Sequence, residues 1–301
     1  MTAPPMVSAV VVTFNSAAVI DECLAGLVGD PRVEVIVVDS GSQDESVAKA
    51  ASFDGVVSIA MAENLGWSAC SNTGARSARA PAIAFVNPDT RTTSDALVRL
   101  ASRLRGEVAA VSPRFVNQDG TGQHFYFRLP NPLTGPFLYL NSGQRIDEKL
   151  GRPVVRWHLY GEVLPIEAVV AHAGAACVVV DAAEFRRLGG FDQRMWIFFS
   201  DVDLSRRLAL TGRRLVVDWD LPVTHLGGGS VKALDLDQLQ LILQRDFIAY
   251  SRVAFGWGGR WLTVGAVWAF SGVVPAAAAL ARGEPRRARE CLSRARSVLR
   301  K

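Results

Sequence analysis

Residues 34–42, Glu-Val-Ile-Val-Val-Asp-Ser-Gly-Ser, decide the fold of this chain. An apolar, mostly β-branched run comes first, and a carboxylate with a Gly/Ser turn follows it directly. A short continuous apolar run before a turn is typical of a strand that is buried on both faces, as in a parallel sheet. We therefore predict a strand over Glu34–Val38 that ends at Asp39, followed by a helix that runs to Ala51.

The same alternation of strand and helix recurs through the first hundred residues. Further strands are predicted over Ala9–Thr13, Val56–Ala60 and Ile83–Val86, with helices over Ala18–Val28, Ala69–Ala78 and Asp95–Leu104. Short apolar strands that alternate with helices predict a Rossmann-like, mostly parallel α/β sheet flanked by helices. Ligands in such sheets bind beyond the carboxyl ends of the strands, where Asn15, Asp39 and Asp89 are expected.

The pattern loosens over Val111–Ile166, where Pro, Gly, Asn and aromatic residues are frequent. We expect loops and short strands there that shape a second substrate site. Regular elements then return as strands Ala176–Val180 and Arg214–Val217 and helices Ala182–Leu188, Asp201–Leu210 and Asp235–Tyr250.

The positive charge of the chain is concentrated at its C-terminal end. The net charge is +4, but the residues from Arg282 onward hold eight basic and two acidic side chains, which gives +6 there and −2 for the rest. Aromatic residues do not interleave with this basic segment, so nucleic acid is not an expected partner. A basic segment of this kind is instead suited to an anionic membrane surface.

The four cysteines lie far apart and form neither a CxxC motif nor a Cys/His cluster. A structural zinc site is therefore disfavoured, and free thiols fit a reducing compartment. The N-terminal residues lack a basic stretch followed by an apolar run and a cleavage site, so no signal peptide is expected. The oligomeric state does not follow from the sequence.

Residues 261–281 carry no charge, and Arg260 and Arg282 flank them. Three interpretations are open: a helix buried against the domain, a transmembrane span, or an interfacial or re-entrant helix with the basic tail on anionic lipid. Gly265, Gly272 and Pro275 interrupt the segment and make a span the weakest of the three. We expect membrane association, at the cytoplasmic face.

Residues 189–204 read Gly-Gly-Phe-Asp-Gln-Arg-Met-Trp-Ile-Phe-Phe-Ser-Asp-Val-Asp-Leu. A glycine turn leads into an apolar, aromatic stretch that ends in Asp201 and Asp203 at the start of a predicted helix. An apolar setting keeps water away from a carboxylate and suits it to act as a general base. On spacing alone, the pair could equally cap the helix, because Asp is favoured at a helix N-terminus.

Six segments in this order resemble family-2 inverting glycosyltransferases of the GT-A fold, in particular their rhamnosyltransferase-like branch. They are Val10–Asn15 (VVVTFN), Val37–Asp44 (VVDSGSQD), Asn64–Gly74 (NLGWSACSNTG), Phe85–Asp89 (FVNPD), residues 189–204 with Gly174–Val180 (GAACVVV) before them, and Thr224–Ser230 (THLGGGS). Each motif alone is weak, but six in this order are specific. The resemblance covers about Val7 to Tyr250.

The resemblance implies a pocket for a nucleotide sugar at the ends of the first strands. Its binding residues would be Thr13, Asn15, Asp39, Asn64, Gly66, Asn72 and Asp89. Asp39 would accept hydrogen bonds from the base, although it could also cap the next helix. Gly66 could serve a turn, and Asn72 could fix backbone.

The resemblance also implies a divalent cation, Mn²⁺ or Mg²⁺. Asp89 stands at the second carboxylate of the family's Asp-X-Asp motif, with Asn87 at the first, and His225 matches a late histidine that completes the site. Such an ion would neutralise charge on the departing diphosphate, and an imidazole ligand favours Mn²⁺. The glycine run after His225 would form a loop that closes over the diphosphate.

Asp201 matches the family's catalytic base, which takes the proton of the acceptor hydroxyl. Asp203 is expected to orient the helix or an arginine. The residue before the base is usually Glu, and Ser200 stands here instead. This departure from the family's pattern affects the prediction of the acceptor's identity more than the prediction of the reaction.

The resemblance therefore implies a metal-dependent inverting transferase in residues 1–232, with a nucleotide-sugar half (1–110) and an acceptor half (111–232). Residues 233–301 form a C-terminal helical, membrane-associating extension. The favoured donor is dTDP-rhamnose, with UDP-galactofuranose and UDP-N-acetylglucosamine as alternatives, and the acceptor is a glycan or a lipid-linked (polyprenyl-diphosphate) glycan of the cell envelope. An inactive sugar-nucleotide-binding scaffold is the second class of function. A nucleotide-dependent oxidoreductase is disfavoured, because no Gly-x-Gly-x-x-Gly follows the first strand.

Overall fold

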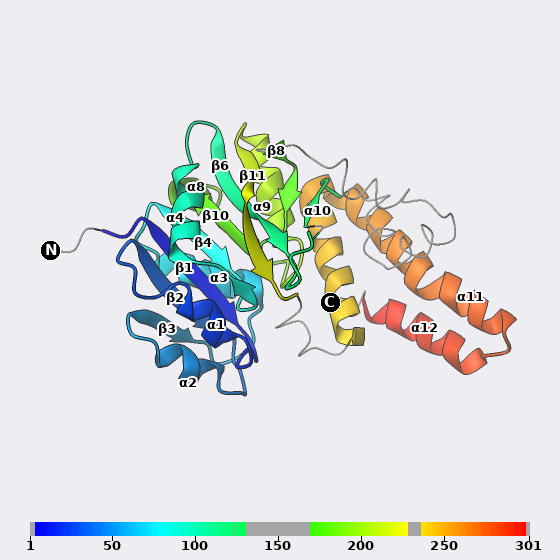
Figure 1. The fold of residues 1–301 in the computed structure, drawn as a ribbon. Coiled ribbons are helices and arrows are strands. Elements are labelled where there is room, and N and C mark those ends of the chain that lie inside the picture. The colour runs from blue at the N-terminus through cyan, green and yellow to red at the C-terminus, as the bar shows by residue number, and fades with distance from the viewer. Residues whose placement is uncertain (1–3, 124, 131–168, 228–235, 299–301) are drawn as a thin grey trace. The chain divides into compact units, whose positions relative to one another are not determined.

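The computed structural model describes residues 4–123, 125–130, 169–227 and 236–298. These residues divide into two compact units (Figure 1). The first unit holds residues 4–123, 125–127, 169–196 and 200–227, and the second holds 128–130, 197–199 and 236–298. The expected domain boundary near residue 232 lies outside the described residues.

The first unit is built on one mixed sheet with the strand order β3-β2-β1-β4-β10-β6-β11-β5. Its strands are β1 (Val7–Thr13), β2 (Val33–Asp39), β3 (Val56–Ala60), β4 (Ala82–Val86), β5 (Thr90–Arg91), β6 (Val108–Val116), β10 (Cys177–Asp181) and β11 (Arg214–His225). The strands β1 to β4 are parallel to one another, and β10 is antiparallel to both β4 and β6. Short strands add β8 (Val169–Val170) to β11 and pair β7 (Tyr126–Phe127) with β9 (His172–Ala173).

The helices of this unit connect the strands as the sequence predicts, with shifted ends. They are α1 (Ile20–Ala25), α2 (Ser46–Ala51), α3 (Trp67–Ser77), α4 (Ser94–Ser102), α8 (Ala182–Arg187) and α9 (Ser200–Leu210). The helix expected over Ala18–Val28 is shorter and continues as turns, and Thr93 caps α4 by accepting the Ala96 amide.

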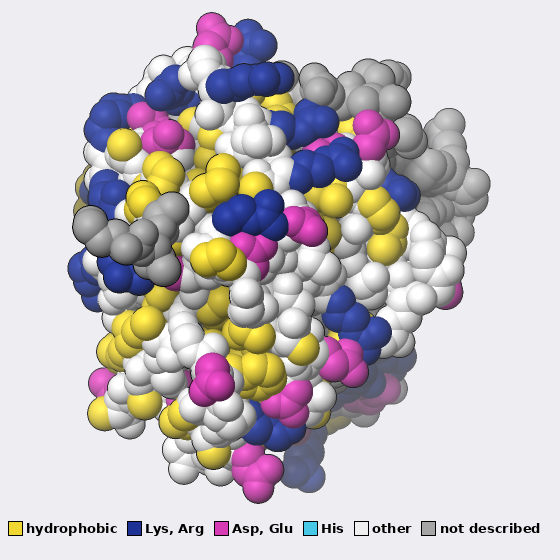
Figure 2. All heavy atoms as spheres, turned by 60° about the vertical axis from the view of Figure 1, so that its left-hand side comes forward, with side chains coloured by type: hydrophobic (Ala, Val, Ile, Leu, Met, Phe, Trp, Pro, Cys, Tyr) yellow, Lys and Arg dark blue, Asp and Glu magenta, His cyan; other side chains and the backbone are white. Residues whose placement is uncertain are grey.

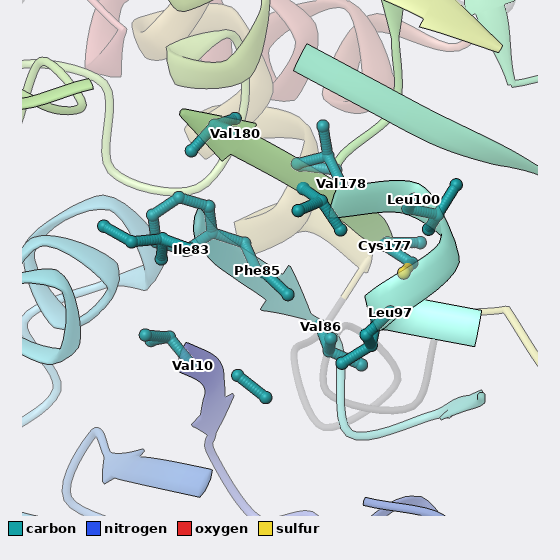
Figure 3. Close-up of a cluster of buried hydrophobic side chains, with 14 of the residues drawn as sticks. Val10, Ile83, Phe85, Val86, Leu97, Leu100, Cys177, Val178 and Val180 are labelled. Carbon is teal, nitrogen blue, oxygen red and sulfur yellow. The ribbon is translucent and has the colours of Figure 1, made fainter. Parts of the chain in front are cut away.

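Strands β1, β2 and β4 are almost wholly buried, which explains their continuous apolar sequences. Figure 3 shows side chains of β1, β4 and β10 beside Leu97 and Leu100 of α4. The parallel register pairs Thr13 with Asp39 at the last position of β1 and β2. The polar residues at the ends of these strands therefore lie at the same edge of the sheet.

Two sequence expectations in this unit have the wrong bounds. The loose segment predicted from Val111 begins inside β6, a regular nine-residue strand that β10 and β11 flank. The strand predicted over Arg214–Val217 continues to His225, across register shifts that include one between Asp218 and Pro222. Pro222 obscured the second half of β11, whose pairing with β6 is long-range.

Figure 2 shows one face of the molecule, on which basic and acidic side chains intermingle. Hydrophobic side chains gather there in small groups between the charges. No broad patch of one sign occupies the coloured part of this face.

The second unit is helical. It contains α10 (Leu236–Trp268), a π-helical turn (Ala269–Val273), α11 (Val274–Ala281) and α12 (Pro285–Ser297). Gly256 interrupts α10 with φ 69° and ψ −161°, so α10 is two helices joined at a kink. Small residues of α11 and α12, such as Ala276, Ala279 and Ala288, pack these two helices against each other (Figure 1).

The uncharged residues 261–281 are buried on one side only. Val264 and Val267 pack with Ile248 and Val298, whereas Trp261, Leu262 and Leu280 stay exposed. Within the described residues, one helical run, Asp237–Ala281, is long and apolar enough to cross a membrane, judged by length and composition alone, and 28% of its window is buried. This is a weak hint of membrane association.

Candidate functional site

The ends of β1 and β2 form the first part of the site. Asp39 is fully buried, and its carboxylate accepts hydrogen bonds from the Thr13 hydroxyl (2.8 Å) and from the Ser42 amide (2.8 Å) and hydroxyl. Asn15 adopts a left-handed φ of 49°, and its side-chain oxygen accepts the Gln43 amide (2.8 Å). The turn after β2 thus holds Asp39 in place. Asp39 does not cap the next helix, because α2 begins at Ser46 with Glu45 at its N-cap position.

The loop before α3 is bound to the same edge. The Asn64 side-chain oxygen accepts the Ser40 hydroxyl and the Gly66 amide, both at 3.0 Å. Gly66 has φ 81°, and a Cβ there would lie 2.2 Å from Cδ1 of Trp196. Glycine is needed at this position both for its backbone conformation and because the indole of Trp196 covers it.

Helix α3 also binds the stretch that leads to the predicted base. The Asn72 side chain donates to the Phe191 carbonyl (2.8 Å) and accepts the Phe191 amide (2.9 Å). Ser68 donates its hydroxyl to the Met195 carbonyl and its amide to the Trp196 carbonyl. Asn72 therefore fixes backbone, as its alternative interpretation held, and links two motifs that lie far apart in the sequence.

Asp89 and His225, the predicted metal ligands, lie side by side. Strands β5 and β11 pair Thr90 with His225, and Nε2 of His225 lies 3.5 Å from Oδ1 of the buried Asp89. Gln123 completes this group. Its amide nitrogen donates to the Asn117 side chain and the His225 carbonyl, so its oxygen, 3.1 Å from Nδ1 of His225, must accept.

This arrangement fits a divalent cation. Nδ1 of His225 donates to Gln123, so a ring with its single proton on Nδ1 turns the lone pair of Nε2 toward the Asp89 carboxylate. Two electron-rich atoms facing each other favour a cation between them. Among the described residues no group of three or more His, Cys, Asp or Glu side chains forms a metal site, so further ligands would come from a diphosphate and water.

Asp201 lies in the first turn of α9, and its carboxylate is anchored on one side. Oδ2 accepts the Ala175 amide (3.2 Å) and lies 3.7 Å from Nε2 of His172, while Oδ1 accepts the Val202 amide. The side chain remains 22% exposed. Asp201 is thus oriented by the protein and still open to a hydroxyl group.

His172 is a buried imidazole that the sequence analysis did not select. Its Nδ1 lies 3.2 Å from the Ser205 hydroxyl, which itself donates to the Asp201 carbonyl. Burial lowers the pKa of His172 below its usual 6.5, although the Asp201 charge acts in the opposite direction. The neutral ring is therefore the favoured form beside Asp201. His172 stands alone between apolar residues in the sequence, so no local pattern predicts that it lies beside Asp201.

Two consecutive residues connect the Asp89 group with Asp201. The Asn87 amide (2.8 Å) and the Thr90 hydroxyl (3.0 Å) both donate to the Ala176 carbonyl, and the Ala175 amide binds Asp201. The start of β10 lies against the end of β4, because Cys177 pairs with Val86. The Gly-Ala-Ala segment thus brings the predicted metal carboxylate and the predicted base to one edge of the sheet.

Asp203 has a different environment. It is fully buried and pairs with Arg206 (2.8 Å) and Arg207 (2.6 Å), as expected of a residue that orients an arginine. Arg207 also donates to the carbonyls of Leu188 and Gly190. Ser200, which stands where the sequence resemblance expects Glu, is buried, and its hydroxyl oxygen has no hydrogen-bond partner among the described residues.

Residues 8–155 match the family model of glycosyl transferase family 2. The match includes Asp39 and Asp89, whereas Asp201 and His225 lie beyond it. No curated protein matches the chain. By sequence, residues 8–155 are thus similar to family-2 glycosyl transferases.

Solved structures show the same fold. The mannosyltransferase PcManGT of Pyrobaculum calidifontis, in complex with GDP-Man and Mn²⁺, has a TM-score of 0.55 at 18% identity over 99% of this chain and 86% of that chain. TarS 1–349 of S. aureus has a TM-score of 0.50 at 15% identity over 97% and 91%. GalNAc-T7, with UDP, GalNAc and Mn²⁺, has 0.53 at 12% identity over 84% and 51%. The fold of this chain is GT-A.

Proposed function

We propose that this protein is an inverting, metal-dependent glycosyltransferase in which Asp201 is the general base. The observation that carries the proposal is the shared support of the two acidic groups. Ala175 binds Asp201, and the adjacent Ala176 carbonyl binds the two residues that bracket Asp89. A base and a diphosphate-binding carboxylate on one sheet edge are what a single in-line displacement requires.

In the proposed reaction, Asp201 takes the proton of the acceptor hydroxyl while that oxygen attacks the anomeric carbon of the donor. The bond from that carbon to the nucleoside diphosphate breaks, and the diphosphate leaves with the electron pair. Asp89 and His225 would hold the divalent cation, which supplies positive charge to the leaving group when bound. The Ala175 and Val202 amides keep the Asp201 carboxylate oriented.

The test of this assignment is Asp201→Asn, which keeps shape and removes the base. We expect transfer to fall at least about 100-fold, with donor affinity within twofold of wild type, because the substitution touches the proton acceptor alone. Asp203→Asn is unsuitable as a control, because it breaks the ion pairs of a buried carboxylate. Asp192→Asn is the control, because Asp192 pairs with the exposed Arg194. Near-normal transfer by Asp201→Asn would refute the base.

For the donor we propose dTDP-rhamnose, and for the acceptor a lipid-linked glycan; the resemblance to the rhamnosyltransferase-like branch supports both. A thermal-shift screen of dTDP-rhamnose, UDP-galactofuranose and UDP-N-acetylglucosamine with Mn²⁺ tests the donor. Stabilisation by dTDP-rhamnose that is lost in Asp89→Ala supports donor and metal site together. Binding without any turnover or hydrolysis would favour the inactive scaffold, to which the buried Ser200 draws attention.

We also propose that the second unit lies on an anionic bilayer. Trp257, Trp261 and Leu262 are 56–62% exposed just after the kink at Gly256. The Arg252 guanidinium lies 4.1 Å from the Trp257 ring centroid, and Arg260 lies over both tryptophans. Exposed indoles with arginines stacked on them are suited to the headgroup region of a membrane.

Vesicle sedimentation tests this docking. The double variant Trp257→Ser/Trp261→Ser should bind phosphatidylglycerol vesicles at least about tenfold more weakly. The matched control is Leu210→Ser, which removes an equally exposed apolar residue (73%) from the first unit. Equal binding by both variants, or no binding by wild type, would refute the membrane proposal and leave the transferase proposal unaffected.

A further inference from the structure

The three residues before α9 are held by helix α10. The amides of Ile197 and Phe198 donate to the same carboxylate oxygen, Oδ2 of Asp246, at 2.9 and 2.8 Å. Asp246 is buried (3% exposed), and it groups with residues 197–199 in the second unit. A buried carboxylate that accepts consecutive backbone amides makes short, charge-assisted hydrogen bonds that fix the path of the chain.

Phe199 itself has a backbone conformation that phenylalanine rarely adopts. Its φ is +67°, in the left-handed region, where the Cβ of an L-residue crowds the backbone. Its ring packs against Phe247 and Tyr250 of α10, with centroid separations of 5.1 and 5.8 Å. A conformation of this kind persists only where its surroundings enforce it, and such residues cluster at functional sites.

The strained residue is joined by a peptide bond to Ser200, the first residue of α9, and Asp201 follows. The direction in which α9 begins therefore depends on residues 197–199. We propose that Asp246 is a positioning residue for the transferase reaction, holding this loop in the conformation that places Asp201. The inference rests on the proposed role of Asp201 as base.

The chemistry of Asp246 predicts a graded series of variants. Asp246→Asn keeps an oxygen with two lone pairs that accepts both amides, whereas Asp246→Ala removes the acceptor and leaves two half-buried donors without it. Phe199→Gly relieves the backbone strain but removes the ring from Phe247 and Tyr250. Asp237→Ala on the same helix is the control, because its carboxylate is 54% exposed and pairs with Arg294 at the surface.

The first readout is amide hydrogen exchange of the full chain. In wild type, Asp246→Asn and Asp237→Ala, the amides of Ile197 and Phe198 should exchange slowly. In Asp246→Ala they should exchange at least about tenfold faster while amides of β1 and β4 stay protected. If the Ile197 and Phe198 amides of a folded Asp246→Ala variant exchange as slowly as in wild type, Asp246 does not hold this loop and the proposal is overturned.

The second readout is catalysis, measured as Mn²⁺-dependent release of nucleoside diphosphate from dTDP-rhamnose, or from whichever donor of the screen stabilises the protein, with water as acceptor. A misplacement of about 1 Å costs on the order of 100-fold in rate, so kcat of Asp246→Ala should fall by that order with KM for the donor within twofold. Asp246→Asn should recover to within about tenfold of wild type.

The outcomes separate this inference from the proposed function. Loss of release in Asp201→Asn with full kcat in Asp246→Ala overturns the positioning role alone. A parallel loss of kcat, donor affinity and melting temperature, with Asp246→Asn no better than Asp246→Ala, means that Asp246 only stabilises the fold and also overturns it. Full activity of Asp201→Asn overturns the base, and the positioning role with it.

Discussion

The substitution Gly190→Ala tests how the nucleotide side of the site is joined to the segment before Asp201. Gly189 and Gly190 both have a left-handed φ, 82° and 74°. An alanine in this region costs about 1–2 kcal/mol, and this term applies at both positions. A Cβ at Gly189 meets no atom within 4 Å, whereas one at Gly190 lies 2.6 Å from the side-chain oxygen of Asn72.

The contact at Gly190 adds a second term. Asn72 must move, and it then loses one or both of its buried hydrogen bonds to Phe191. A buried donor or acceptor left without a partner costs about 1–3 kcal/mol. The free energy of unfolding should therefore fall by about 1–2 kcal/mol for Gly189→Ala and by about 2–5 kcal/mol for Gly190→Ala.

Urea denaturation of both variants, with equal m-values, measures the difference. Asn72→Ala in the Gly190→Ala background provides the cycle, because the second term should shrink once the Asn72 side chain is absent. Equal losses of unfolding free energy in Gly189→Ala and Gly190→Ala would refute the role of the two Asn72–Phe191 hydrogen bonds. Additive losses in the double variant Asn72→Ala/Gly190→Ala would refute it as well.

Three further predictions concern buried ionisable groups. His172 has a pKa lowered by burial, so protonation favours the unfolded chain; the stability it contributes is complete above about pH 6.5 and is lost as pH falls through the folded pKa. Urea midpoints from pH 5 to 8 should show His172→Phe with a smaller acid loss than wild type, and parallel curves would contradict this. Asp203→Ala should cost about 3–5 kcal/mol, because it removes a buried carboxylate and leaves the half-buried Arg206 and Arg207 without it; a loss under 1 kcal/mol by denaturation would be inconsistent with that pairing. Burial raises the pKa of Cys177 to about 12, so in the native protein Cys291, which is partly exposed, should react with a disulfide reagent at pH 8 while Cys177 stays unmodified until urea is added; equal rates would contradict the burial.

Much of the nucleotide side of the fold could be predicted from the sequence. Strands buried on both faces leave continuous apolar runs, and the turn residues after them mark where each strand ends. Thr13 and Asp39 were predicted at adjacent strand ends, and the parallel register pairs them. Each of the six motifs forms a local turn that the sequence alone can predict. Their order along the chain indicated the GT-A fold.

Other features depend on pairings that no local pattern records. His225 reaches Asp89 because β11 continues past Pro222 along β6, and a proline is ordinarily a sign that a strand has ended. Gln123 and His172 stand in segments without periodicity, and their roles follow from contacts with His225 and Asp201. Asn72 was predicted either to bind the nucleotide sugar or to fix backbone, and in the structure its side chain forms two hydrogen bonds with the backbone of Phe191.

The parallel strands, the turns at their carboxyl ends and the acidic groups of the site could be predicted from local sequence, since these features depend on short-range sterics and burial. The tertiary structure alone decided which groups meet: Asp89 with His225 and Gln123, Asp201 with His172, and the loop before Asp201 with Asp246. The physical reason is that these contacts join residues far apart in the chain, up to 136 positions for Asp89 and His225. Their geometry is set by sheet register and helix packing, which are properties of the whole folded chain.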